Sequence, residues 1–178
     1  MIAKTSMAMA DLKTSIKEKI TLRFISIITL IWVADFFTKV WAVKELSSGQ
    51  VINIVSDVFR FQLVYNTGGV FGIMQNNAMF FQFLTGFAIL FLLFYYIKTE
   101  DGNTAFNFAI SFILGGAVGN FTDRFFRHGV VDFIDMGIGN ARWPTYNIAD
   151  AFISTGAVLL AIAFFQIEKA ARERDRAE

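Results

Sequence analysis

Four carboxylates occur between and inside two apolar segments in the C-terminal half of the chain. They are Asp123, Asp132, Asp135 and Asp150. An ionisable group at membrane depth costs about 2.5–3.5 kcal/mol on insertion scales, so a chain keeps several of them close together mainly for function. When two carboxylates are brought together one pKa rises, and a pair that shares one proton can activate water against a carbonyl carbon. The cluster therefore indicates acid–base chemistry.

Two Asn-x-x-Asp patterns offer a way to hold such a pair. They occupy 120–123 and 147–150, at the end of one apolar segment and the start of the next. Positions i and i+3 share one face of a helix, so each Asn can orient its own Asp. This symmetry favours Asp123 with Asp150, although spacing alone does not decide between Asp123 and Asp132 as the partner of Asp150.

The same residues also have structural interpretations. The acids can form ion pairs with Arg124 and Arg127 and only hold helices together, and Asp132 can be a solvated charge on a short interfacial strand or helix. Asp35 can face the cluster or pair with Lys39 one turn away, and helix geometry slightly favours the pair. The number of acids flanked by Asn favours chemistry over a purely structural role.

The residue types present argue against other kinds of catalytic site. Cys is absent, so there is no disulfide, thiolate nucleophile or Cys-ligated metal. The single histidine, His128, does not suffice for a histidine-based metal site. Ser111 lies within an apolar segment and His128 in a polar loop, which does not suit a Ser–His pair. We therefore expect no metal and no organic cofactor.

The composition is that of a membrane protein. Of the 178 residues, 55% are hydrophobic and 17% are charged, against roughly 25% charged in soluble domains. The length predicts a single domain over 1–178. The net charge of +1 gives no overall attraction to nucleic acid, so we expect no nucleic-acid partner.

Four apolar segments are each close to the roughly 20 residues that a membrane-spanning helix needs. We expect these spans at 22–43, 78–97, 104–121 and 148–166. The polar segments between and around them are a tail at 1–20 and two loops at 45–77 and 122–147.

The first loop has a different pattern from the spans. Apolar and polar residues alternate from Phe59 to Tyr65, which predicts a half-buried strand. A glycine-bearing turn follows at 66–72, in which Asn66 fits a plain turn residue. The expected fold is a mainly α membrane protein: four transmembrane helices with a small extracytoplasmic β-sheet on the membrane surface.

The distribution of Lys and Arg predicts the orientation in the membrane. Ten basic residues lie in the two tails and the 98–103 turn, and six lie on the other side. Basic residues favour the cytoplasmic side. Both termini are therefore expected in the cytoplasm, with 45–77 and 122–147 in the periplasm.

Five motifs, taken in order, resemble the lipoprotein signal peptidase (signal peptidase II) family. They are Asp35-x-x-Thr38-Lys39; Tyr65-Asn66-Thr67-Gly68 with Phe71-Gly72; Gly119-Asn120-x-x-Asp123-Arg124; Gly129-x-Val131-Asp132-Phe133-x-Asp135; and Trp143-Pro144-x-x-Asn147-x-Ala149-Asp150. The match covers about residues 22–168. Phe36 stands where the family usually has Gln, and Gly69-Val70 where Ala-Ala is common.

The resemblance implies an aspartyl endopeptidase of the bacterial inner (cytoplasmic) membrane, with its active site near the periplasmic face. It would cleave the signal peptide from diacylglyceryl-modified prolipoproteins before the lipidated Cys. Carried over by motif, the catalytic pair is Asp132 and Asp150, which replaces the symmetric choice of Asp123. The positions that match supporting or substrate-binding residues are Asp35, Lys39, Asn66, Gly68, Asn120, Asp123, Arg124 and Asn147.

The implied partners are diacylglyceryl-prolipoprotein substrates and membrane lipids, and we expect a monomer. An alternative of another class is a small transporter or channel component with a carboxylate-lined path. Such proteins often contain inverted repeats of spans. The two Asn-x-x-Asp patterns hint at one, but no longer repeat supports it.

Overall fold

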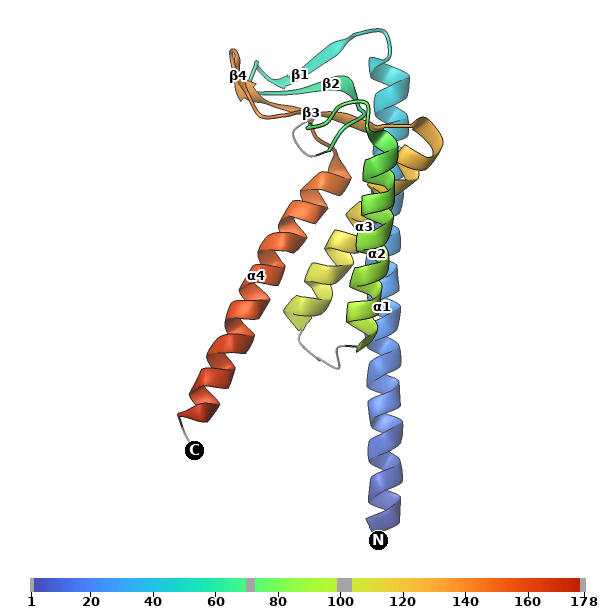
Figure 1. Ribbon diagram of the computed structural model, residues 1–178, viewed down its shortest axis with the longest axis vertical. Helices are drawn as coiled ribbons and strands as arrows, with labels where there is room; N and C mark the ends of the chain where they lie inside the picture. Colours follow the sequence, from blue (N-terminus) through green and yellow to red (C-terminus); the bar gives the residue numbers. More distant parts are fainter. Residues whose placement is uncertain (1, 70–72, 99–103, 177–178) are drawn as a thin grey trace.

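The computed structural model describes residues 2–69, 73–98 and 104–176, and shows helices that carry a small sheet at one end (Figure 1). The elements, in chain order, are α1 (Ile2–Leu46), β1 (Val51–Val55), β2 (Phe59–Asn66), α2 (Ala78–Lys98), α3 (Thr104–Arg127), β3 (Val130–Ile138), β4 (Ala141–Arg142) and α4 (Ile148–Asp175). The Phe71-Gly72 motif and most of the 98–103 turn lie outside the described residues.

Each of the four helices is long and apolar enough to cross a membrane. The candidate spans are Thr21–Leu46, Ala78–Lys98, Thr104–Arg127 and Ile148–Lys169. Both ends of the chain lie opposite the sheet (Figure 1). The predicted fold class, four membrane helices with a small β-sheet, is confirmed.

Two helices extend beyond the expected spans. Helix α1 begins at Ile2, inside the expected polar tail, because no Gly or Pro interrupts the chain before Gly49. Helix α3 continues past 121 to Arg127, and its last-turn arginines complement the negative end of the helix dipole. Asp123 therefore lies on a helix and not in a loop.

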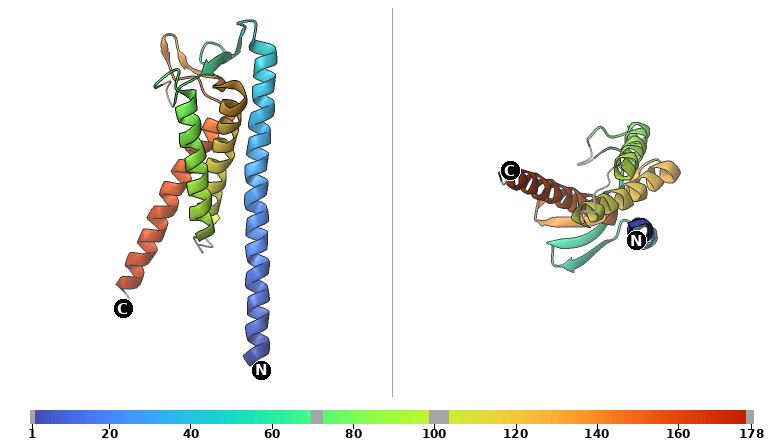
Figure 2. Two further views of the ribbon diagram at one scale, coloured as in Figure 1. Left: turned by 45° about the vertical axis from the view of Figure 1, so that its right-hand side comes forward. Right: turned by 90° about the horizontal axis from the view of Figure 1, so that it is seen from below.

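Helix α3 is the centre of the bundle and packs against α1, α2 and α4, as the view from below shows (Figure 2). Two glycines permit the close approach of α1. A Cβ on Gly115 would lie 2.8 Å from the Ile31 Cβ, and a Cβ on Gly119 would lie 2.5 Å from the Asp35 Oδ2. Glycine at 119 is thus what lets a carboxylate of α1 lie directly against α3.

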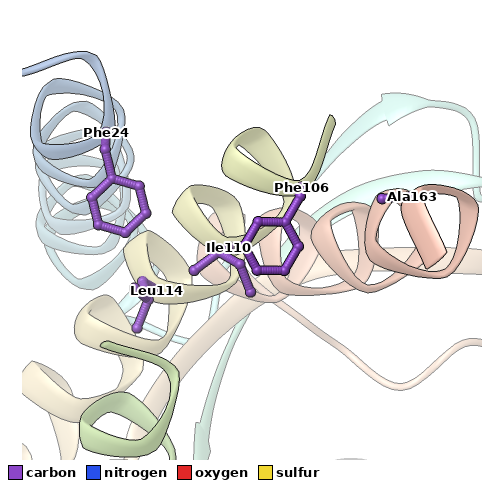
Figure 3. Close-up of a cluster of buried hydrophobic side chains, with 5 residues drawn as sticks. All are labelled: Phe24, Phe106, Ile110, Leu114 and Ala163. Carbon is purple, nitrogen blue, oxygen red and sulfur yellow. The ribbon is translucent and has the colours of Figure 1, made fainter. Parts of the chain in front are cut away.

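Buried apolar side chains form one cluster at each end of the bundle. The cluster far from the sheet is drawn in Figure 3 and contains Phe24, Phe106, Ile110, Leu114 and Ala163. The cluster beneath the sheet contains Ala42, Leu46, Phe133 and Ile134. Helix α2 has no buried residue among those described, and its apolar surface suits contact with lipid.

The sheet has the order β1-β2-β3-β4 and is antiparallel. Between β2 and β3, Arg60 pairs with Asp135 and Val64 with Asp132, and the register shifts between these two pairs. Asp132 and Asp135 are 2% and 3% exposed. The interpretation of Asp132 as a solvated charge is therefore wrong, because this strand packs between its neighbours and the bundle.

A charge network fixes the register of β2, β3 and β4. Both oxygens of Asp135 are occupied, one by the Nε of Arg60 and the other by the Nε of Arg142 at 2.7 Å. Asp57 binds the same two arginines, at 3.2 Å and 3.4 Å. A slip of one residue would turn every side chain of β3 to the other face, so this network also determines where Asp132 lies.

Candidate active site

Polar side chains from five elements meet where the sheet joins the helices. Those with direct hydrogen bonds or ion pairs to one another are Asp35 and Lys39 of α1, Asn66 of β2, Asn120, Asp123 and Arg124 of α3, Asp132 of β3, and Asn147 and Asp150 at the start of α4; Gly68 joins them through its backbone. The structure thus brings together every site residue that the sequence singled out.

Lys39 lies at the buried centre of this network. Its side chain is 1% exposed, and its ammonium lies 2.7 Å from the Asp35 Oδ2 and 2.9 Å from the Asp123 Oδ2. It also donates to the Asn120 Oδ1 at 3.0 Å. A buried ammonium is tolerated only when paired and hydrogen-bonded, and here all three of its protons have an acceptor.

Asp35 satisfies both interpretations that its spacing allowed. It pairs with Lys39 one turn away on α1. Its other oxygen accepts a hydrogen bond from the backbone N–H of Ala149 at 2.9 Å, in the first turn of α4. One carboxylate therefore ties α1 to the element that carries Asp150.

Asp123 holds structure and does not face Asp150. Its Oδ2 accepts from the backbone N–H of Val131 at 3.1 Å and binds Lys39, while the Nε of Arg127 lies 3.7 Å from its Oδ1. Among the described residues its partners come from α1, α3 and β3 and none from α4. This environment disfavours the symmetric pairing of Asp123 with Asp150.

Asn147 connects Asp132 to Asp150. Its Oδ1 accepts from the backbone N–H of Asp150 at 2.9 Å, and its own backbone N–H donates to the Asp150 Oδ2 at 3.2 Å, a reciprocal helix cap. Because the cap occupies its carbonyl oxygen, its amide nitrogen points at the Asp132 Oδ1, 2.7 Å away. Asn147 is fully buried, so this orientation is fixed by contacts on every side.

The chain reaches this position through a backbone bridge to β3. The N–H of Ile134 donates to the Tyr146 carbonyl at 2.8 Å, and the N–H of Tyr146 donates back to the Ile134 carbonyl at 3.0 Å. Asn147 follows directly, so the bridge sets the start of α4 beside Asp132.

Asn120 orients the other carboxylate. Its Oδ1 accepts from Lys39 and, at 3.2 Å, from the Asn147 amide. Its Nδ2 is thereby left to donate to the Asp150 Oδ1 at 2.8 Å. The expectation that each Asn orients the Asp three residues later holds for Asn147 with Asp150. It is wrong for Asn120, which lies against Asp150 because α3 and α4 cross there.

Asn66 is a turn residue that also reaches the site. Its Oδ1 accepts from the Gly68 N–H at 3.0 Å, which is a local turn. Its Nδ2 donates to the Asp132 Oδ2 at 3.2 Å and to the Gly69 carbonyl at 3.3 Å. The turn interpretation is thus incomplete, since the contact with Asp132 depends on the pairing of β2 with β3.

The two carboxyl groups bridged by Asn147 differ in environment. Asp132 is 2% exposed, while Asp150 is partly exposed. Burial, with the nearby Asp150 charge, raises the pKa of Asp132 from 3.8 to about 7, against the opposing effect of the hydrogen bonds from Asn66 and Asn147 and of the Lys39 charge. Near neutral pH the pair therefore carries one readily exchanged proton.

Arg124 lies beside the pair with part of its hydrogen-bonding capacity unused. It donates to the Asn120 carbonyl at 3.4 Å and to the Gly68 carbonyl at 3.3 Å, and its guanidinium lies 5.9 Å from the centre of the Phe81 ring. Its buried Nε has no partner among the described residues. The idea that the acids merely pair with arginines is not supported at Arg124, whose contacts are to backbone oxygens.

Comparison with known proteins gives one consistent match. The family model of signal peptidase (SPase) II matches residues 27–166. A lipoprotein signal peptidase of Clostridium novyi is 39% identical over 131 residues, 73% of this chain and 88% of its own length, and that of Bacillus subtilis is 39% identical over 133 residues. A bacterial membrane enzyme solved by the in meso method at 2.3 Å resolution superposes with a TM-score of 0.73 at 29% identity, covering 81% of this chain and 88% of its own.

Replacing the buried ammonium should destabilise the protein strongly. Lys39→Met leaves the carboxylates of Asp35 and Asp123 buried without a counter-charge, which costs about 3–5 kcal/mol. Lys44→Met, on the same helix but with its side chain 79% exposed, should change stability by less than about 0.5 kcal/mol. Thermal unfolding in detergent measures both, and equal melting temperatures for the two variants would contradict the role of Lys39.

The raised pKa of Asp132 predicts a pH-dependent gain on its replacement. The folded state holds this proton up to about 7 and the unfolded state only up to about 3.8, so folding stability falls as pH rises between these values. Asp132→Asn removes that loss. Its melting temperature should exceed that of the parent by more at about pH 8 than at about pH 5, whereas Asp57→Asn should show no such trend. A pH-independent difference would refute the assigned pKa.

Proposed function

Because the chain belongs to the signal peptidase II family, we propose that it is an aspartyl endopeptidase that cleaves the signal peptide from diacylglyceryl-modified prolipoproteins before the lipidated Cys. The observation that carries the proposal is the pair Asp132 and Asp150, bridged by Asn147 and buried at the junction of sheet and helices. Family membership favours this function over the transporter or channel component considered above.

The hydrogen bonds of Asp150 suit the role of general base. Both of its oxygens already accept, one from Asn120 and one from the backbone of Asn147. It also lies in the first turn of α4, where the helix dipole favours a negative charge. These contacts support an ionised Asp150, which would remove a proton from the attacking water.

Asp132 is suited to be the acid. Its burial holds a proton to higher pH than an ordinary carboxyl group, and it would donate this proton to the oxygen of the scissile carbonyl as water oxygen bonds to the carbon. The tetrahedral intermediate then collapses: the C–N bond breaks, and the proton taken up by Asp150 passes to the leaving amine. The oxygen returns its proton to Asp132, so that both acids regain their starting states.

The remaining polar residues would position substrate or the two acids. The unused Nε of Arg124 and the turn at Gly68 lie next to the pair, and donors of this kind can bind a backbone carbonyl of an extended peptide. Asp35, Lys39 and Asp123 would not contact substrate, because all three are buried; through Asn120 they fix the direction of the hydrogen bond to Asp150.

The proposal includes an orientation in the bacterial inner membrane. Both termini would be cytoplasmic, in agreement with the excess of basic residues in the tails, and the sheet and the acids would lie near the periplasmic face. There the signal helix could enter from the lipid with its diacylglyceryl chains still in the bilayer. The chain would act as a monomer, without metal or organic cofactor, since the pair with its water suffices for the reaction.

Neutralising either acid should abolish cleavage. We expect Asp132→Asn and Asp150→Asn each to lower the rate by about 10²–10⁴-fold or more, because each removes a group that transfers a proton. The measurement is cleavage of a lipidated precursor peptide by purified protein in detergent, where no membrane gradient exists.

Two controls make this experiment decisive. Asp57→Asn also removes a carboxylate from the sheet region, but Asp57 contacts only Arg60, Arg142 and the Gly139 backbone, so it should cleave at nearly the parental rate. Thermal unfolding shows whether each variant is folded. A folded Asp132→Asn or Asp150→Asn protein that cleaves within about tenfold of the parent would overturn the assignment.

A further inference from the structure

A cavity lies between α1 and α3 near the ends of these helices that are remote from the sheet. Its polar lining includes Arg23 of α1 with Thr104 and Asn107 of α3. Its apolar lining includes Phe24, Ile27 and Phe108. We call this the α1/α3 cavity. The acids of the proposed catalytic pair lie at the opposite end of the bundle, so this cavity is not a part of that site.

The polar side chains of the α1/α3 cavity are uncommitted. In the part of the chain whose side chains are described, those of Arg23, Thr104 and Asn107 form no hydrogen bond or ion pair with another residue. Ser111, deeper in the cavity, donates its hydroxyl to the Asn107 backbone carbonyl at 2.7 Å and is occupied. Arg23 differs in this respect from Lys39, Arg60 and Arg142, which bind carboxylates.

The chemistry of these groups favours an anion with several oxygens. A guanidinium presents a planar fork of donors that matches phosphate, and a hydroxyl and an amide add neutral donors. An acidic side chain is not among the lining residues, so nothing in the cavity repels such an anion.

The position of the cavity specifies where that anion would come from. Candidate spans begin at Thr21 and Thr104, which places Arg23 and Thr104 at the membrane boundary. Phe24 is 5% exposed, belongs to the buried cluster of Figure 3 and stacks on Tyr96 with ring centroids 3.8 Å apart. The cavity therefore has a firm apolar wall below a cationic entrance, at the level of lipid headgroups.

We propose that the α1/α3 cavity binds the phosphodiester group of an anionic phospholipid in the leaflet opposite the catalytic pair. Arg23 pairs with the phosphate, Thr104 and Asn107 donate to its oxygens, and the start of an acyl chain lies along Ile27 and Phe108. Basic pockets between membrane helices bind anionic headgroups in this way. The bound lipid joins α1 to α3 at the end of the bundle where no ion pair between these helices is found among the described residues.

Thermal unfolding in a neutral detergent tests this proposal. Because a ligand that binds only the folded state stabilises it, phosphatidylglycerol should raise the melting temperature of the parent by several degrees more than the same amount of phosphatidylcholine does. Arg23→Gln should lose most of this difference. Lys98→Gln removes a basic residue from the same membrane face but outside the cavity, and should retain it.

Further arms separate the possible results. Asn107→Ala should weaken the response while leaving the charge unchanged, and it serves as the test if Arg23→Gln does not fold. A response of Arg23→Gln or Asn107→Ala equal to that of the parent would overturn the proposal, as would equal stabilisation by the two lipids. Inorganic phosphate alone should have little effect, and full stabilisation by it would exclude a lipid as the required ligand.

Discussion

The buried ammonium of Lys39 is the interaction on which the rest of the site depends. It neutralises Asp35 and Asp123 and holds the Asn120 carbonyl oxygen, and each of these contacts leads to a different element. Asp35 continues to the α4 backbone at Ala149, and Asp123 to the β3 backbone at Val131. One charge therefore sets α1, α3, α4 and β3 in a single arrangement, at a depth where loss of any partner would leave a charge unpaired.

This framework makes two chemically identical acids unequal. Asp150 sits in the first turn of α4 with its oxygens accepting from Asn120 and Asn147, whereas Asp132 lies on a buried strand. The direction of each asparagine amide follows from what holds its oxygen: the ammonium in Asn120 and the helix cap in Asn147. The site thus needs no flexible part to keep the proton on one acid and the charge on the other.

How much could be predicted from sequence depends on the range of each interaction. The four helices, the strand from Phe59 and the Asp35–Lys39 pair follow from local periodicity, which a single chain displays. The contacts of Asn66 with Asp132 and of Asn120 with Asp150 do not, because they require β2 to pair with β3 and α3 to cross α4. Spacing alone favoured Asp123, whereas the family motifs indicated Asp132. The structure provides the physical reason, since the Tyr146 bridge brings Asn147 and Asp132 together.

The central claim is that Asp132 must be protonated and Asp150 ionised for the peptide bond to be cleaved. The most direct test is the pH dependence of single-turnover cleavage of a lipidated precursor peptide in detergent. Because the pKa of Asp132 is raised to about 7, the rate constant should fall as pH rises through that value, when the acid loses the proton it donates. A rate constant that stays level or increases from about pH 6 to about pH 9 would contradict the account.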